Sequence, residues 1–156
     1  MVKPAEARRE LADRHRRIAM THRCHEKQRE IESARLNRLR LAVVLLSALE
    51  ATGVVAAIVT TQRAYLICAA VLAFISLSAS LCLYVYKPEE REAEHHDAAA
   101  DYLALRNRAS RATSAPDAEL VSELRAIDDE VARLARARRT PGAKAYRTAR
   151  KDATRK

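Results

Sequence analysis

Residues 41–86 read LAVVLLSALEATGVVAAIVTTQRAYLICAAVLAFISLSASLCLYVY, a stretch in which only Glu50 and Arg63 carry a charge. The 156-residue chain has 29 Lys and Arg and 20 Asp and Glu, and all the others lie on either side of this stretch. Such separation is typical of a membrane segment, because a soluble core interleaves its apolar residues with polar ones. The basic balance therefore does not indicate nucleic-acid binding, and we expect no specific nucleic-acid partner.

The stretch divides into two apolar segments, residues 41–61 and residues 64–86. Each is longer than the roughly 20 residues with which an α-helix crosses about 30 Å of hydrocarbon. Gln62 and Arg63 separate them, so the two helices must be antiparallel neighbours. A buried soluble hairpin would need apolar cover that the rest of the chain does not supply. We predict an all-α membrane protein, a two-transmembrane helical hairpin (residues 41–86) with long N-terminal and C-terminal cytoplasmic helices.

The charges that flank the two segments predict the orientation of the hairpin. Several cations precede the first segment and others follow the second, whereas Arg63 alone lies in the turn. The positive-inside rule therefore places both termini in the cytoplasm, in a multi-pass protein of the lipid bilayer. A secretory signal is not expected, because the first apolar residue of the stretch follows a long polar arm. Cys24, Cys68 and Cys82 are scattered and odd in number, which predicts no disulfide framework.

Glu50 stands near the middle of the first segment, where an acidic group costs about 2.5–3.5 kcal/mol on insertion scales. An antiparallel alignment about the short turn sets Glu50 level with Ser76, Gly53 opposite Ala73 and Ala57 opposite Ala69. Small residues then face each other across the two helices and allow close approach. The candidate helix-packing or pore-lining residues are Ser47, Glu50, Gly53 and Ala57 on the first helix, and Ala69, Ala73, Ser76 and Ser80 on the second.

Two interpretations of Glu50 follow from this alignment. In the first, a neutral Glu50 carboxyl forms a hydrogen bond with Ser76 inside one hairpin, which is a purely structural role. In the second, Glu50 faces the axis of a homo-oligomer, because two helices cannot enclose an aqueous path and a ring of carboxylates would favour cations. The two are compatible if opening exposes a carboxyl that is neutral in the closed state.

The arms outside the hairpin are also expected to be helical. Residues 5–40 lack Gly and Pro and predict one helix that continues into the first span. Pro88 should break the second span, and residues 89–139 should form helices. In the first of these, one stripe carries His95, Ala99, Tyr102 and Leu105. We expect a disordered basic tail over residues 140–156, which contains Pro141, Gly142 and few large apolar side chains.

A second cytoplasmic helix should begin at the Ser114-Ala115-Pro116-Asp117 sequence, which has the spacing of a capping box. Its apolar residues recur by alternating steps of four and three, the pattern of a helical seam. That pattern is compatible with packing inside one chain and with a coiled coil between chains. The seam consists of Leu120, Leu124, Ile127, Val131 and Leu134.

Catalytic and metal-binding motifs are not evident in the sequence. His22, Cys24 and His25 suggest a metal site, but Cys24 would point away from the two histidines and no second ligand pair has zinc-site spacing. We therefore expect no metal, no cofactor and no enzymatic activity, since nucleophile and phosphate-binding motifs are missing too. A proton sensor built from His15, His22 and His95 is a minor alternative that follows from imidazole chemistry.

The layout resembles the SLATT family, two-transmembrane effector domains associated with SMODS nucleotidyltransferases and SLOG sensors in bacterial conflict systems. The resemblance rests on the helical arm before Leu41, the closely spaced spans, and HHDAAADYLAL at residues 95–105, whose H-x3-A-x2-Y-x2-L spacing is similar to the post-membrane motif of the family. It covers roughly residues 5–135 and adds no catalytic residue.

This resemblance implies a pore-forming or membrane-disrupting effector of the bacterial cytoplasmic (inner) membrane in anti-phage defence by abortive infection. Its trigger would come from a separate sensor or nucleotidyltransferase-type protein, because the chain contains neither. The alternative from another class is a non-conducting membrane scaffold that tethers a cytosolic partner through its C-terminal helices. A phage-type holin is a third possibility, although large cytoplasmic arms would be superfluous to it.

Overall fold

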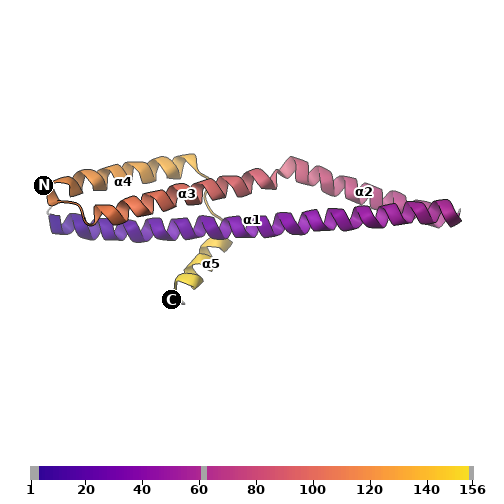
Figure 1. Ribbon diagram of the computed structural model, residues 1–156, viewed down its shortest axis with the longest axis horizontal. Helices are drawn as coiled ribbons and strands as arrows, with labels where there is room; N and C mark the ends of the chain where they lie inside the picture. The colour runs from indigo at the N-terminus through magenta and orange to yellow at the C-terminus, as the bar shows by residue number, and fades with distance from the viewer. Residues whose placement is uncertain (1–3, 61–62, 155–156) are drawn as a thin grey trace. The chain divides into compact units, whose positions relative to one another are not determined.

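The computed structural model describes residues 4–60 and 63–154, and these residues are helical apart from short connections (Figure 1). No strand occurs among them, which confirms the all-helical prediction. Two of the helices are long and apolar enough to cross a membrane. The elements are α1 (Pro4–Thr60), α2 (Arg63–Tyr86), α3 (Pro88–Ala112), α4 (Asp117–Ala137) and α5 (Ala143–Thr154).

The chain forms two compact units, and α1 contributes to both. We call Glu32–Glu90 the apolar unit, because it contains the apolar part of α1 and all of α2. We call Met1–Ile31 with Arg91–Lys156 the polar unit, because it combines the polar part of α1 with α3, α4 and α5. Each unit has its own packing principle and is described by itself.

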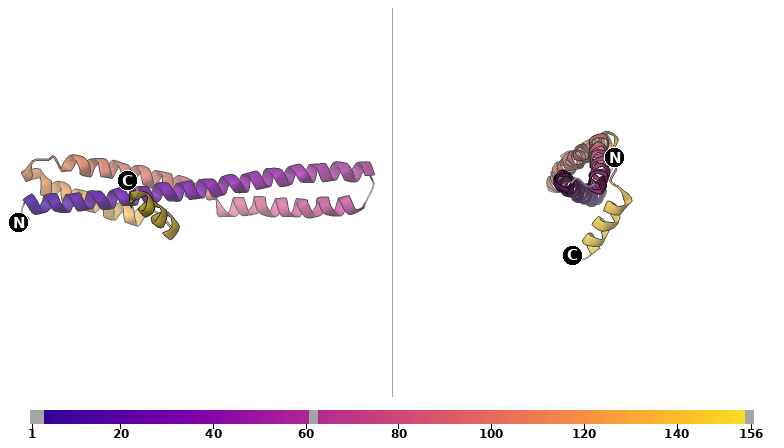
Figure 2. Two further views of the ribbon diagram at one scale, coloured as in Figure 1. Left: turned by 90° about the horizontal axis from the view of Figure 1, so that it is seen from below. Right: turned by 90° about the vertical axis from the view of Figure 1, so that its right-hand side faces the viewer.

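In the apolar unit the second part of α1 and α2 run antiparallel, side by side in both views (Figures 1 and 2). The Oγ atoms of Ser47 and Ser76 lie 3.4 Å apart. A Cβ atom added to Gly53 would lie 3.6 Å from the Cβ of Ala69, so the two backbones approach closely at this glycine. Small residues therefore form the contact between these helices, as the sequence predicted.

The register of this contact differs from the predicted one by about one helical turn. Gly53 faces Ala69 rather than Ala73, and Ser76 faces Ser47 rather than Glu50. Helix α1 ends at Thr60 and α2 begins at Arg63, each one residue earlier than predicted, and this moves the midpoint between the two helices toward the N-terminus, in the same direction as the register. Thr61 and Gln62, which the sequence placed at the end of the first span and in the turn, lie outside the described residues.

The break between α2 and α3 falls at Lys87. Its φ of 41° is in the left-handed region, and its amide N–H donates to the Leu83 carbonyl at 3.2 Å, which ends α2. Pro88 then begins α3, one residue earlier than predicted. Proline suits the first position of a helix, because the N–H that it lacks would have no partner inside the helix there.

In the polar unit α1, α3 and α4 pack side by side around one apolar core (Figures 1 and 2). The predicted seam of α4 lies in this core: Leu120, Leu124, Ile127 and Leu134 are buried and Val131 packs against them. Leu11 and Ile18 from α1 and Tyr102 and Leu105 from α3 complete it. The seam is thus occupied by helices of its own chain, which is the intramolecular form of the two packings compatible with its spacing.

The capping box predicted at Ser114 is wrong. Helix α4 has Pro116 at its N-cap and no side-chain cap, while the Ser114 N–H donates to the Arg111 carbonyl at 3.0 Å as part of the turn that ends α3. The Arg8 guanidinium binds the polar groups of the connection between α3 and α4. It donates hydrogen bonds to the Thr113 carbonyl and to Asp117 Oδ1, both at 2.7 Å. Arg8 of α1 thus holds the connection between α3 and α4, but as a donor it does not cap the N–H groups of α4.

The disordered tail predicted from residue 140 is also corrected, because Ala143–Thr154 is helix α5. Ala145 and Ala149, one turn apart, are buried and form its packing face. The Gly142 N–H donates to Gln28 Oε1 at 3.2 Å, and Asp152 lies 3.3 Å from the Lys27 ammonium. Alanines make this contact, so a search for large apolar residues does not find it.

Candidate functional site

The face predicted for helix packing or pore lining is only partly covered in a single chain. Its members differ in exposure along the two helices. Ala57, Ala69 and Ser76 are buried, Glu50, Gly53 and Ala73 are half-buried, and Ser47 and Ser80 are exposed.

Glu50 lies on the side of α1 that faces α2. It is half-buried, as are Val43, Leu46 and Gly53, and together they recur at the three- and four-residue steps of one helix face. Among the residues that the structure describes, no hydrogen bond or ion pair joins Glu50, and the Ser76 hydroxyl is directed to Ser47 instead. The hydrogen bond between Glu50 and Ser76 expected from the sequence is therefore not formed.

Three hydroxyl groups of the apolar unit form their hydrogen bonds within their own helices. The hydroxyls of Thr52, Ser78 and Ser80 donate to the carbonyls four residues earlier, at 2.9, 2.8 and 2.9 Å. Such hydroxyls require neither water nor another chain in hydrocarbon. Glu50 has no such partner among the residues that the structure describes, and a carboxyl group placed in hydrocarbon would need one. This difference makes Glu50 the candidate functional residue of the apolar unit.

The polar unit holds a second candidate site, a buried pair formed by His25 of α1 and His95 of α3. Their Nδ1 atoms lie 3.2 Å apart and their ring centroids 5.4 Å apart. Tyr102 stacks on His25 with centroids 5.3 Å apart and ring planes inclined by 20°. The residues His25, His95 and Tyr102 are only 2, 5 and 5% exposed. An N–H of one ring donates to the other, so this contact is complete when both rings are neutral.

The surroundings of this pair keep His25 neutral. Burial lowers the pKa of His25 to about 4, and the nearby His95, His22 and Arg138 lower it in the same direction. Burial also lowers the pKa of His22, whose Nδ1 has no hydrogen-bond partner among the described residues and lies 3.7 Å from Glu26 Oε2. Desolvation by burial is the common cause, because it penalises the charged form of an imidazole.

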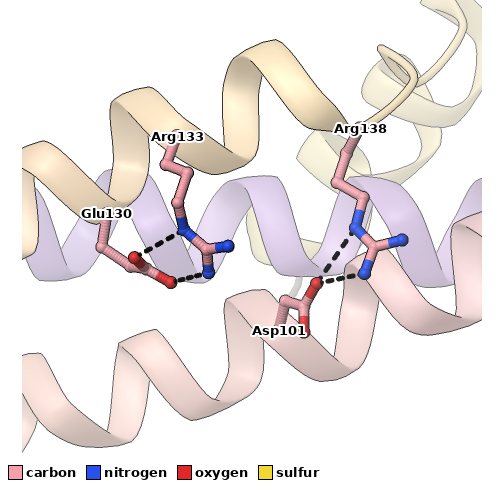
Figure 3. Close-up of polar contacts among 4 residues, drawn as sticks. All are labelled: Asp101, Glu130, Arg133 and Arg138. Carbon is pink, nitrogen blue, oxygen red and sulfur yellow. Dashed lines mark hydrogen bonds and ion pairs between the residues drawn. The ribbon is translucent and has the colours of Figure 1, made fainter.

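A salt bridge directly after the end of α4 connects this helix to α3 beside the imidazole pair. Arg138 donates to Asp101 Oδ2 from Nε at 3.0 Å and from a terminal nitrogen at 2.6 Å (Figure 3). Asp101 precedes Tyr102, so this bridge fixes the segment of α3 that stacks on His25. One turn earlier on α4, Arg133 pairs with Glu130 of the same helix (Figure 3).

The structure brings together part of what the sequence singled out. His95, Ala99, Tyr102 and Leu105 all lie buried on one face of α3. The pairing of His95 with His25 was missed, because the sequence grouped His25 with His22 and Cys24 as metal ligands. No cluster of three or more metal-ligating side chains occurs in the described ranges. One signal was available: Leu11, Ile18 and His25 follow at seven-residue steps, which assigns His25 to the buried face of α1.

Comparison with known proteins gives one family. Residues 8–152 match the family described as "SMODS and SLOG-associating 2TM effector domain family 4", which covers nearly the whole chain. No match was found among curated proteins or among solved structures.

Proposed function

Because the chain belongs to the SMODS and SLOG-associating 2TM effector domains (family 4), we propose a function in keeping with that family. The chain is an oligomeric effector that opens an ion path through a membrane. The family name supports an effector that works with SMODS or SLOG partners in conflict systems. Two helices long and apolar enough to cross a membrane support a membrane location. The ion path through the membrane and the partner that triggers its opening are the parts that we propose.

The proposed topology places the apolar unit in the bacterial inner membrane, with both termini in the cytoplasm. Cations flank the outer ends of the two apolar segments, whereas Arg63 alone lies at the connection. Large apolar side chains such as Phe74 and Leu77 are 72 and 69% exposed, as expected of a surface that meets lipid or other chains. The polar unit would then be cytoplasmic and available to a separate signalling protein.

Glu50 is the observation that carries the pore proposal. Two helices cannot surround water, so conduction requires several copies of the chain. Glu50 is half-buried, with no hydrogen bond or ion pair to the rest of the described chain. Assembly of several apolar units would give these carboxyl groups a shared, hydrated environment, and a ring of carboxylates favours cations.

The trigger would reach the membrane through α1. This single helix, Pro4–Thr60, contributes residues to both units, so a change in the packing of its first half can alter the second half. A sensor or nucleotidyltransferase-type partner acting on the polar unit is the proposed source of that change. The chain itself carries no segment that resembles such a sensor.

The test is ion flux from liposomes that contain the full chain and an ion reporter, with and without the partner encoded beside it. We expect cation release that falls in Glu50→Gln and persists in Ser78→Ala, a control on α2 whose hydroxyl is satisfied within its helix. The proposal is contradicted if no preparation releases ions, or if both substitutions leave the flux unchanged.

The alternative function is a non-conducting membrane scaffold that tethers a cytosolic partner through its helical C-terminal region. Leu120 and Ile127 are fully buried in the polar unit, so they are not available to another protein in this conformation. Such a scaffold would have to use a different surface.

A further inference from the structure

The buried imidazole pair between α1 and α3 has a chemistry that the proposed pore does not use. We propose that His25 and His95 form a proton-operated latch, which holds α3 against α1 while both rings are neutral and releases it when the surrounding solution becomes acidic. The latch regulates the proposed effector, and in that respect it rests on the proposed function.

The geometry makes the contact sensitive to protons in two steps. In the neutral pair one Nδ1–H donates across the 3.2 Å gap to the other Nδ1, and the acceptor ring carries its proton on Nε2. A first proton binds Nε2 of the donor ring, so the hydrogen bond persists but a charge is now buried. A second proton can bind only at the accepting Nδ1, which leaves two N–H groups facing each other between two cations.

The charged groups that act on His25 give a charge on this ring no relief. On α1, His22 lies close enough to act on His25, and it is itself influenced by Glu26, Arg23 and Arg106. At the end of α4, Arg138 adds a positive charge that is partly offset by Asp101 at 2.6 Å. On α3, Tyr102 stacks on His25 as a neutral ring.

Every group that acts on His25 therefore opposes its protonation. Burial, His95, His22 and Arg138 each lower the pKa of His25, whose ordinary value is 6.5 and which reaches about 4 here. An opened bundle would return both imidazoles to water, where they accept protons near pH 6.5. Acid thus favours the open arrangement, because the imidazoles bind protons more tightly in the open form than in the closed form.

A second side-chain contact joins α1 and α3 beside the pair. The Arg29 guanidinium donates to Nδ1 of His96, with the two nitrogens 2.9 Å apart. Arg29 follows His25 by one turn of α1, and His96 follows His95 on α3. The imidazole pair therefore has a neighbouring contact between the same two helices.

In a cell the latch would make opening self-reinforcing. A cation path through the membrane admits protons along with other cations, and the cytoplasm then acidifies. The protons that enter through the path would bind the histidine pairs in the polar units of further copies and open these copies too. The stimulus for the first opening remains the partner of the proposed function.

The test compares the full chain, reconstituted in lipid nanodiscs, with a His25→Gln/His95→Gln variant that keeps hydrogen-bonding groups but cannot titrate. His15→Gln, which replaces a half-buried histidine on α1 outside the pair, is the matched control. Hydrogen exchange of α3 amides, corrected for intrinsic rates, is measured from pH 7.5 to 4.5. We expect the opening constant of the natural chain to rise roughly tenfold per pH unit below 6.5 for each proton taken up. The double variant should show a much weaker dependence, and His15→Gln should behave as the natural chain does.

Equal pH dependence in the natural chain and the double variant would overturn the latch. The single variant His95→Gln guards against misfolding, and it should lose most of the dependence as well. A histidine NMR titration adds a readout independent of activity, in which His25 must titrate well below pH 6.5 in the closed chain. An ordinary value near 6.5 would contradict the proposal. If acid opens α3 but no ion flux follows under any condition, the latch stands and the pore proposal fails.

Discussion

One unit of this chain buries its large apolar side chains, whereas the other exposes them. In the polar unit Leu11, Leu120 and Ile127 are fully buried, so water drives the packing of α1, α3 and α4. In the apolar unit Phe74 and Leu77 face outward, and the contact between α1 and α2 is made by Gly53, alanines and serines. In the proposed function, lipid and further copies of the chain would cover these outward-facing side chains.

The largest expected effect comes from removing a core side chain of the polar unit. Ile127→Ala should lower the free energy of unfolding by about 2–5 kcal/mol, because it leaves a cavity at a fully buried position. Phe74→Ala in the apolar unit should change it by less than about 0.5 kcal/mol. Urea titrations of both variants in the same detergent check this contrast. Similar losses at the two positions would contradict the division into inward-facing and outward-facing units.

Acid should weaken the polar unit and spare the apolar one. His25 is neutral in the fold and has a pKa of about 4 there, against 6.5 as its ordinary value. Its contribution to stability is therefore complete above pH 6.5 and is lost as the pH falls toward 4, by about 3 kcal/mol in all. Urea midpoints measured at pH 7.5, 5.5 and 4.5 should fall for the natural chain. A midpoint that rises or stays level over this range would contradict the sign.

The close approach of α1 and α2 can be broken at Gly53. Ser47→Cys with Ser76→Cys, in a chain from which Cys24, Cys68 and Cys82 have been removed, should form a cross-link on oxidation, because the serine oxygens are 3.4 Å apart. Adding Gly53→Leu should prevent the cross-link and cost about 1–3 kcal/mol, since the side chain would enter the space beside Ala69. Glu50→Cys with Ser76→Cys is the control for the register predicted from sequence. Preferential cross-linking of that pair would show the observed register to be wrong.

The smallest effect is expected at the bridge between Arg138 and Asp101. Both side chains are about a third exposed, so solvent screens the pair and Asp101→Asn should cost roughly 0.5–1 kcal/mol. The cost should shrink in high salt. Glu90→Gln removes the charge that pairs with Lys87 in the apolar unit. This pair is more exposed than the Arg138–Asp101 bridge, so its loss should cost less still. A loss of several kcal/mol for Asp101→Asn would mean that this bridge, rather than the apolar core, organises the polar unit.

The sequence predicted the features that depend on one segment at a time. The length and apolarity of residues 41–86, the buried stripe from His95 to Leu105 and the α4 seam each follow from local composition and helical spacing. The features that it did not predict depend on distant residues. Arg8 binds the connection before α4, Ala145 and Ala149 pack α5, and His25 on α1 contacts His95 on α3.

The candidate site in the apolar unit shows the same limit. Local pattern identified Glu50 and the small residues around it, but the register depends on where α2 begins. A start one residue earlier, at Arg63, accompanies the pairing of Ser76 with Ser47 and leaves Glu50 without a bond in the described chain. The role assigned to the half-buried Glu50 carboxyl thus depends on the register of the two helices.

In the proposed function, copies of this chain assemble an ion path lined by Glu50. Currents recorded across planar bilayers under a KCl gradient, with the full chain and with Glu50→Gln at matched protein density, test this assembly. We expect cation-selective currents for the natural chain and a reversal potential that moves toward zero for Glu50→Gln. Currents with the same reversal potential in both, or no currents in the presence of the activating partner, would contradict it.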